Sequence, residues 1–272
     1  MKDSQGTYTN SLKIANKFNV FFVNVGPSLA KTFSPNTNNH KQYLTGSYNS
    51  IIFLSPISPS EIITTINLLK NSKSEGIDGI SISVIKSCAD ILALPLYYIF
   101  NASISHGIFP DSLKVAKIIP IFKNDDCSNF SNYRPISILS CFSKILEKLV
   151  YKRFLAYLEK YDILNYHQYG FQKNHSTFMP ITELIDNIYS SFEIKRFTIG
   201  IFIDLKKAFD NVNHSILLDK LAFCGFRGNA LNWIKSYFEN RYQSVQINEI
   251  KSSSKPIKCG VPKAPSLDHY CF

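Results

Sequence analysis

Two acidic residues and an aromatic residue lie close together in the string IFIDLKKAFDNVNH, residues 201–214. Apolar residues alternate along 197–203, and this period of two predicts a β-strand whose last position carries Asp204. A carboxylate at the tip of a strand, just before a turn, is well placed to hold a divalent metal ion. Asp also favours caps and turns, so a structural role for Asp204 is the alternative that this string alone leaves open.

The same string resembles the first catalytic motif of reverse transcriptases, in the form used by jockey-like non-LTR retrotransposons. The resemblance implies that Asp204, with the backbone carbonyl of Leu205, binds Mg2+ in a two-metal nucleotidyl transfer. It also implies that Phe209 fills the space of a ribose 2′-hydroxyl and so favours dNTPs. The backbone amides of Lys207 and Ala208 would face the phosphates.

Residues 114–154 resemble the fingers motif of this family, a strand, a polar hairpin and a return into a helix. In the family, a Lys on the hairpin and an Arg before a Pro grip the triphosphate, and the matching positions are Lys123 and Arg134. Arg presents a planar fork to phosphate oxygens, while Lys supplies a compact point charge. A solvated basic hairpin without a ligand is the alternative.

Three further blocks follow the family order. The string at 71–81 resembles the Gly-rich segment that opens the fingers, and the string at 167–177 resembles the next fingers block, with Gln172 where many relatives carry Arg. The last block, GVPKAPSLDHYCF, departs from the family pattern. There Lys263 and Ala264 stand in place of the Gln and Gly that approach the template and primer.

The second carboxylate motif of these polymerases, an aromatic-Ala-Asp-Asp string, occurs nowhere in the 272 residues. Asp204 alone offers the oxygens of a single carboxylate, which is too few for two metal ions and a triphosphate. In the relatives, the missing hairpin also pairs with the Asp204 strand, so we expect an unpaired sheet edge. We therefore predict that this chain by itself neither polymerises nucleotides nor folds a stable palm, and that it binds Mg2+ weakly or not at all.

The composition is that of a basic globular protein, with 45% hydrophobic residues and a net charge of +10. The basic excess falls on 114–173 and 195–272, which favours binding of polyanions in a salt-dependent manner over a generic basic surface. The six cysteines form no Cys-x-x-Cys pair and are typical of reduced thiols. We find no signal-peptide core and no apolar run of membrane length, so we expect a nuclear or cytoplasmic protein with no membrane partner.

Local signals predict a helix-rich α+β chain, the fingers and a partial palm of a right-hand polymerase with a small, mainly antiparallel sheet. Ser58, Pro59 and Glu61 predict a helix start with a capping box, and Gly107 predicts a left-handed helix end. Helices are expected at 12–25, 59–69, 83–105, 140–161, 176–194, 214–223 and 228–239, and strands at 116–122, 197–204, 242–248 and 255–260. An aromatic stripe on the last helix favours a core face over a base-stacking surface, and its residues are Trp233, Tyr237 and Phe238.

Residues 31–50 are polar and resemble a linker, so we expect the folded body to begin near residue 51. The expected organisation is an N-terminal helix and linker over 1–50, a fingers-like region over 51–195 and an incomplete palm over 196–272.

The leading hypothesis is a fragment of an RNA-directed DNA polymerase, with an RNA template, a DNA primer and dNTPs as partners. Such a fragment would be a truncated genomic relic or an incomplete gene model. The rival hypothesis is a non-catalytic nucleic-acid-binding module derived from the fingers.

Overall fold

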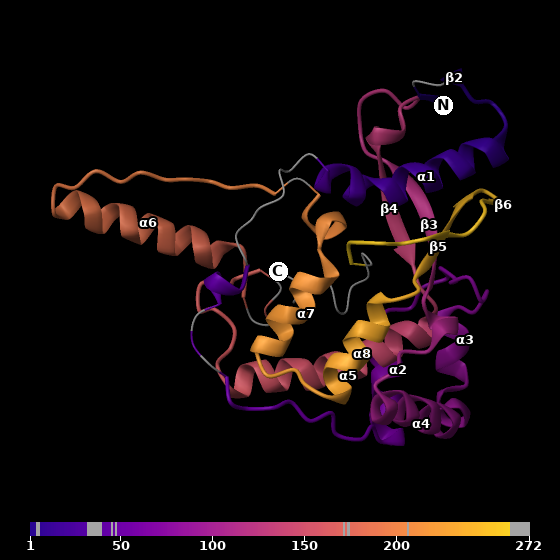
Figure 1. Cartoon of the computed structure of the whole chain (residues 1–272), viewed down its shortest axis with the longest axis horizontal. Coiled ribbons are helices and arrows are strands. Elements are labelled where there is room, and N and C mark those ends of the chain that lie inside the picture. Colours follow the sequence, from indigo (N-terminus) through magenta and orange to yellow (C-terminus); the bar gives the residue numbers. More distant parts are fainter. Residues whose placement is uncertain are drawn as a thin grey trace.

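The computed structural model describes residues 1–3, 6–31, 40–44, 46, 48–170, 172, 175–205 and 207–261. Figure 1 shows a packed body with a small sheet at one end, and one helix, α6, that extends away from this body. The helices are α1 (Ser11–Ala30), α2 (Pro59–Leu68), α3 (Ile82–Ser87), α4 (Ala89–His106), α5 (Cys141–Lys160), α6 (Phe178–Glu193), α7 (His214–Phe223) and α8 (Asn229–Phe238). The strands are β1 (Lys2–Asp3), β2 (Gly6–Thr7), β3 (Val115–Phe122), β4 (Tyr133–Ile138), β5 (Tyr242–Ile247), β6 (Ile250–Lys251) and β7 (Lys255–Pro256).

The larger sheet has the strand order β4-β3-β5-β6, and β7 pairs with β5. Strand β3 is antiparallel to β4 and parallel to β5, with Ile118 opposite Val245. The other pairings of β5 are antiparallel. The chain is therefore a helix-rich α+β structure with a small mixed sheet, in agreement with the predicted class.

The main core lies between the helices of the body. Helix α5 buries one complete face, and α8 packs Trp233 fully into the interior. The Trp233 ring stacks on Tyr237 and meets Phe109 edge-on, with ring centroids 5.2 Å apart. Phe238 is also buried. The aromatic stripe is thus a core face, as predicted from the sequence.

Helix α2 begins as predicted, except for its capping box. The Ser58 hydroxyl accepts a hydrogen bond from the Glu61 amide at 3.2 Å, and Pro59 is the first helical residue. The Glu61 carboxylate does not complete the box, because it pairs with both terminal nitrogens of Arg153 on α5 at 2.9 Å. Hydrogen bonding and the positive charge of Arg153 lower the pKa of Glu61. A long-range ion pair has replaced the Glu61 half of the capping box, while the Ser58 cap remains.

One long predicted helix is divided in two. Cys88, with φ −115° and ψ 15°, separates α3 from α4. Gly107 ends α4 in the left-handed conformation at φ 65°, as predicted.

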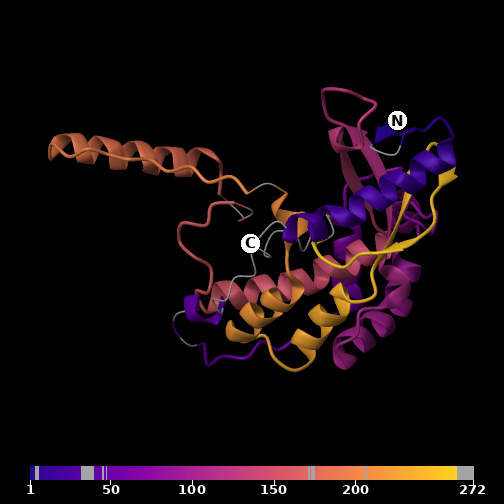
Figure 2. The same cartoon turned by 45° about the horizontal axis from the view of Figure 1, so that its top comes forward.

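Helix α1 lies across the sheet in both views (Figure 1, Figure 2). Phe18 is buried in a second apolar cluster with Ile118 of β3 and Val245 of β5. The expectation that the folded body begins near residue 51 is therefore wrong for this helix. Its partner strands, β3 and β5, are far from α1 in the sequence, so the local pattern gives no signal of this packing.

Residues 197–205 form no strand, contrary to our prediction. In Figure 1 this segment runs back along α6 toward the body. Its apolar side chains are largely in solvent, with Ile199 87% and Phe202 85% exposed. Alternation favours an extended chain, but a strand also needs a partner, and within the described residues this segment has no backbone hydrogen bond.

Among the described helices, none combines the length and the apolarity that crossing a bilayer requires.

Candidate functional site

Asp204 comes just before a short turn that carries the other residues of its motif. Lys207 adopts a left-handed conformation at φ 55°, and Ala208–Asn211 then form a 3-10 helix. We call residues 207–212 the Phe209 turn. The side chains of Asp204, Leu205 and Lys207 are exposed, whereas Phe209 is half-buried. The structure therefore leaves the acid open to solvent and anchors the aromatic residue beside it.

The GVP string holds the Phe209 turn in place through backbone hydrogen bonds. The Val261 amide donates to the Phe209 carbonyl, and the Gly260 amide donates to the Val212 carbonyl, both at 3.0 Å. A side chain on Gly260 would come within 2.9 Å of the Phe209 carbonyl oxygen, and its φ of 81° also favours glycine. Two motifs that are distant in the sequence thus share one backbone site.

Lys123 and Arg134 lie on the same face of the β3–β4 hairpin. The register pairs Ile121 with Arg134 and Phe122 with Tyr133, and the Lys123 amide donates to the Asn132 carbonyl at 2.8 Å. Lys123 therefore continues the ladder and points to the same side as Arg134, since side chains alternate along a strand. Both side chains are exposed. The hairpin presents two cations that an anionic ligand can reach together.

A small cavity of about 60 Å3 separates the hairpin from the Phe209 turn. Pro135, the residue after Arg134, lines it from β4, and Asp210, the residue after Phe209, lines it from the turn. Gly26 of α1 and Arg241 also line this cavity. The structure thus brings the backbone of the hairpin and the turn to opposite sides of one cavity, whereas Lys123 and Arg134, which alternate with Pro135, lie on the other face of the hairpin.

Arg241 and Glu147 are buried charged residues that interact electrostatically, and our sequence analysis missed both. Arg241 donates from Nη1 to the Tyr237 carbonyl at 3.0 Å, while its Nε and Nη2 have no hydrogen-bond partner among the described residues. Glu147 of α5 is fully buried and accepts from the Ser143 hydroxyl at 2.8 Å. Burial raises the pKa of Glu147, and the positive charge of Arg241 opposes this effect. The sequence signal that could have revealed Glu147 is its position on the face of α5 that carries the buried apolar residues.

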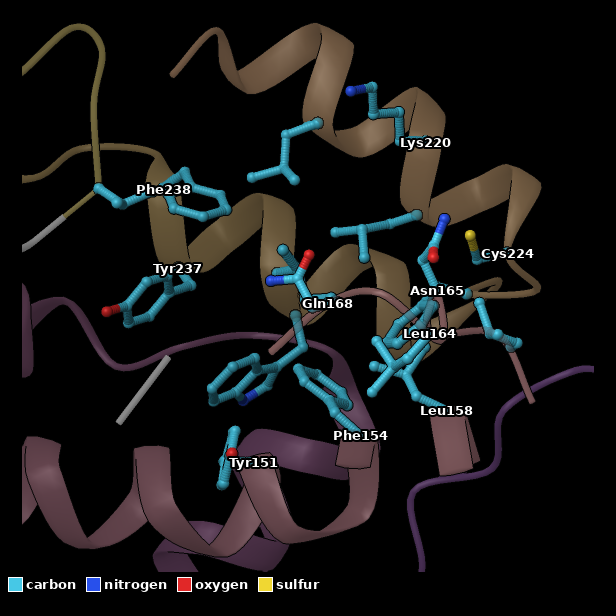
Figure 3. Close-up of a pocket in the computed structure, with 17 residues that line it drawn as sticks. Tyr151, Phe154, Leu158, Leu164, Asn165, Gln168, Lys220, Cys224, Tyr237 and Phe238 are labelled. Carbon is cyan, nitrogen blue, oxygen red and sulfur yellow. The ribbon is translucent and has the colours of Figure 1, made fainter. Parts of the chain in front are cut away.

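A larger cavity of about 290 Å3 lies between α5, α7 and α8 (Figure 3). Aromatic side chains such as Phe154 and Phe238 line it, and Lys220 is the one basic residue in its described wall. An apolar enclosure of this kind suits an apolar group and not a triphosphate. Val261 belongs to this wall, so the cavity adjoins the Gly260–Val261 segment that holds the Phe209 turn.

Of the proposed template contacts, the structure describes Gln172. Gln172 is half-buried in the segment before α6, where its carbonyl accepts a hydrogen bond from the His175 amide at 3.4 Å. Lys263 and Ala264 lie outside the described residues.

The described residues do not form a complete metal site. Within the described ranges, no group of three or more His, Cys, Asp or Glu side chains is arranged to hold an ion. Asp204 with the Leu205 carbonyl would supply at most part of a ligand set. The chain as described therefore does not fit a two-metal centre.

The chain is similar in sequence to a reverse transcriptase family model and to polymerases of mobile elements. Residues 121–271 match the family model described as "Reverse transcriptase (RNA-dependent DNA polymerase)". The chain is 33% identical over 215 residues to the "Probable RNA-directed DNA polymerase from transposon BS" of Drosophila melanogaster, covering 79% of this chain and 24% of that protein. It is 31% identical over 228 residues to the "RNA-directed DNA polymerase from mobile element jockey" of the same species, covering 84% and 25%.

The jockey polymerase of Drosophila funebris is 32% identical over 213 residues, covering 78% of this chain and 23% of that protein. The chain spans about a quarter of the length of these curated relatives. The family match covers more than half of the chain, from the β3–β4 hairpin through α5 to the GVP string. This protein therefore belongs to the reverse transcriptase (RNA-dependent DNA polymerase) family, in its jockey-like, non-LTR retrotransposon branch, and that family generally uses divalent metal ions.

Proposed function

We propose that this chain supplies the fingers and part of the palm of an RNA-directed DNA polymerase that takes an RNA template, a DNA primer and dNTPs. Residues 51–195 would be the fingers-like region, 196–272 the incomplete palm, and Mg2+ the ion of the complete enzyme. The observation that carries the proposal is the pair of backbone hydrogen bonds between the Phe209 turn and Gly260–Val261. They join two motifs that the family resemblance places in the polymerase site, one assigned to metal and dNTP and the other to template and primer.

In this proposal, the hairpin and the turn bind different parts of the dNTP. Arg134 and Lys123, exposed on one face, would contact the triphosphate oxygens. The amides of Lys207 and Ala208 would add phosphate contacts, and the half-buried Phe209 ring would exclude a 2′-hydroxyl. Further contacts with template and primer are proposed for Gln172, Lys263 and Ala264.

We further propose that the chain by itself binds nucleic acid and dNTP but does not add the nucleotide to the primer. Asp204 is exposed, and the described residues give it no partner acids. The segment that carries Asp204 also has no paired strand among the described residues. In-line transfer needs reacting groups held close to their productive geometry, which an unsupported carboxylate does not provide.

Two assays on poly(rA)·oligo(dT) test the proposal. In the first, labelled dTTP should bind the chain, and Arg134→Ala and Lys123→Ala should each weaken that binding roughly tenfold, since charge-assisted hydrogen bonds contribute about 1.5–3 kcal/mol. Lys70→Ala is the matched control, because Lys70 is an exposed lysine outside the hairpin. Equal binding by the hairpin and control variants would reject the proposed site.

In the second assay, the chain alone should not extend the primer. Synthesis by the wild-type chain that is lost in Asp204→Asn would show that the catalytic part of the proposal is wrong.

The second candidate function is nucleic-acid binding without any catalytic role. The net charge of +10 and the incomplete metal ligand set among the described residues favour it. It predicts RNA binding that weakens steeply with salt, persists in Asp204→Asn and falls in Lys123→Ala and Arg134→Ala. Under this alternative, labelled dTTP does not bind at all.

A further inference from the structure

Helix α1 contacts three parts of the candidate site that are far apart in the sequence. These are the β3–β4 hairpin, the β5–β7 edge of the sheet and the Phe209 turn. Each contact uses a different kind of interaction.

The contact with the hairpin is aromatic. The buried Phe18 ring meets Phe130 edge-on at a centroid distance of 4.7 Å, and Tyr133 at 4.9 Å. Phe130 lies in the hairpin loop, and Tyr133 precedes Arg134 on β4. Edge-to-face pairs have a preferred geometry, so they fix the hairpin relative to the helix.

The contact with the sheet is polar and buried. The Asn19 side chain has no exposed surface, and its Nδ2 donates to the Ser253 carbonyl at 2.7 Å and to the Ser252 hydroxyl at 3.1 Å. Its Oδ1 accepts from the Gln243 side chain at 3.0 Å. A slide of α1 along the sheet would leave this amide buried and unpaired, so the hydrogen bonds specify one position.

The contact with the Phe209 turn depends on close backbone approach. A methyl group on Gly26 would overlap the Asp210 carbonyl oxygen and lie 2.5 Å from Cys259 Sγ. Nearby, Lys207 Nζ lies over the Phe21 ring, 5.6 Å from its centroid. Glycine is therefore the residue that lets α1 touch the turn.

We infer that α1 is a positioning element for nucleotide binding, which sets the separation between the hairpin cations and the Phe209 turn. One continuous helix joins Phe18 to Gly26, a span of about 12 Å at 1.5 Å per residue. Because the same rigid helix contacts both the hairpin and the Phe209 turn, a change in how α1 packs on the sheet moves Arg134 relative to Phe209. This inference rests on the proposed function, and it gives a positioning role to residues of α1 that would not themselves contact the nucleotide.

The competing explanation is that α1 only covers the sheet. That explanation predicts that weaker packing of α1 on the sheet lowers the free energy of unfolding without a selective effect on the affinity for dTTP. The positioning role predicts a loss of dTTP affinity while RNA affinity, which depends on dispersed basic residues, is retained.

The test variants are Gly26→Ala and Asn19→Ala, with Asn24→Ala and Ser28→Ala as exposed controls on the same helix. The first measurement is the alkylation rate of Cys259, read by mass spectrometry. The thiolate is the reactive species, and burial, followed by the charge of Asp210, raises the pKa of Cys259 in the folded chain. The second and third measurements are the Kd for labelled dTTP on poly(rA)·oligo(dT) and the Kd for RNA alone.

We expect both test variants to raise the alkylation rate and the dTTP Kd about tenfold, because local opening exposes Cys259 and because one lost charge-assisted hydrogen bond to the nucleotide costs about 1.5–3 kcal/mol. RNA affinity and the helical circular dichroism should stay within twofold of wild type, as should all values of the controls. If Gly26→Ala loses its helical circular dichroism spectrum and therefore fails to fold, the measurements on Asn19→Ala alone test the inference.

Three other outcomes would overturn the inference. An unchanged Cys259 alkylation rate in both test variants would show that α1 does not hold the turn. Faster alkylation with unchanged dTTP Kd, while Arg134→Ala still weakens dTTP, would make α1 a covering helix and leave the proposed function intact. If Arg134→Ala also has no effect on dTTP, the proposed function fails, and the positioning role fails with it.

Discussion

The packed body and the arm formed by residues 178–205 contain similar apolar side chains in very different surroundings. In the body, α5 buries Ile145 and Leu149 completely. In the arm, α6 buries no residue, and the segment after it exposes one large apolar side chain after another. Apolar surface of this extent is typical of a segment made to pack against something else. A periodic apolar pattern therefore specifies a face, whereas burial also requires a partner.

The largest expected effect is a difference in stability between matched aromatic truncations in the two regions. Trp233→Ala should lower the free energy of unfolding by about 3–5 kcal/mol, because it leaves a cavity in a filled core. Phe202→Ala in the arm should change it by less than about 0.5 kcal/mol, because that ring is already in solvent. Urea unfolding followed by circular dichroism measures both. A cost for Phe202→Ala close to that of Trp233→Ala would mean that the arm is packed in solution.

A second, smaller effect should appear in the pH dependence of stability. Because burial raises the pKa of Glu147, the folded chain holds that proton at pH values where the unfolded chain has lost it. Stability should therefore fall as the pH rises from the ordinary Glu value of 4.5 through the raised pKa, by up to about 1.4 kcal/mol per pH unit. Glu147→Gln should remove this slope in a series of urea titrations.

The arm supplies the control for that experiment. Phe202→Ala should leave the slope as in wild type, because that ring lies in solvent and carries no titratable group. Parallel slopes for wild type and Glu147→Gln would show that another buried group causes the pH dependence.

The smallest expected effect concerns the first turns of two helices. Ser58 caps α2 through its hydroxyl, whereas Thr177 before α6 makes no side-chain cap hydrogen bond. Ser58→Ala should cost about 1 kcal/mol, and Thr177→Ala should be neutral within about 0.5 kcal/mol. The difference in urea midpoint between the two variants reads out the contrast. A cost for Thr177→Ala as large as that of Ser58→Ala would contradict it.

Features governed by local chemistry could be predicted from the sequence. The Ser58 cap and the left-handed end at Gly107 depend on a few neighbouring residues, and both occur as expected. Strand β5 was also predicted, and it forms because β3 lies beside it. The alternating segment 197–205 has the same pattern without a described partner, and the strand predicted there is absent.

Features set by distant contacts could not be predicted. Glu61 was expected to cap its own helix, but Arg153 provides a bidentate ion pair that a sequence pattern does not reveal. The shared face of Lys123 and Arg134 depends on the hairpin register, which their spacing alone leaves open. Gly26 did carry a signal, since a glycine inside an apolar helix stripe often marks close backbone approach.

The order of strands in the sheet has a consequence for synthesis of the protein. Strand β5 sits between β3 and the last strands, and it also receives Asn19 of α1. A ribosome makes α1 and β3 long before β5, so the parts of Phe18 and Ile118 that β5 covers stay exposed until Val245 is made. Pairings between such distant segments fold slowly, and the waiting surfaces are prone to aggregation. A product cut short before Tyr242 would never bury them and would depend on chaperones to remain in solution.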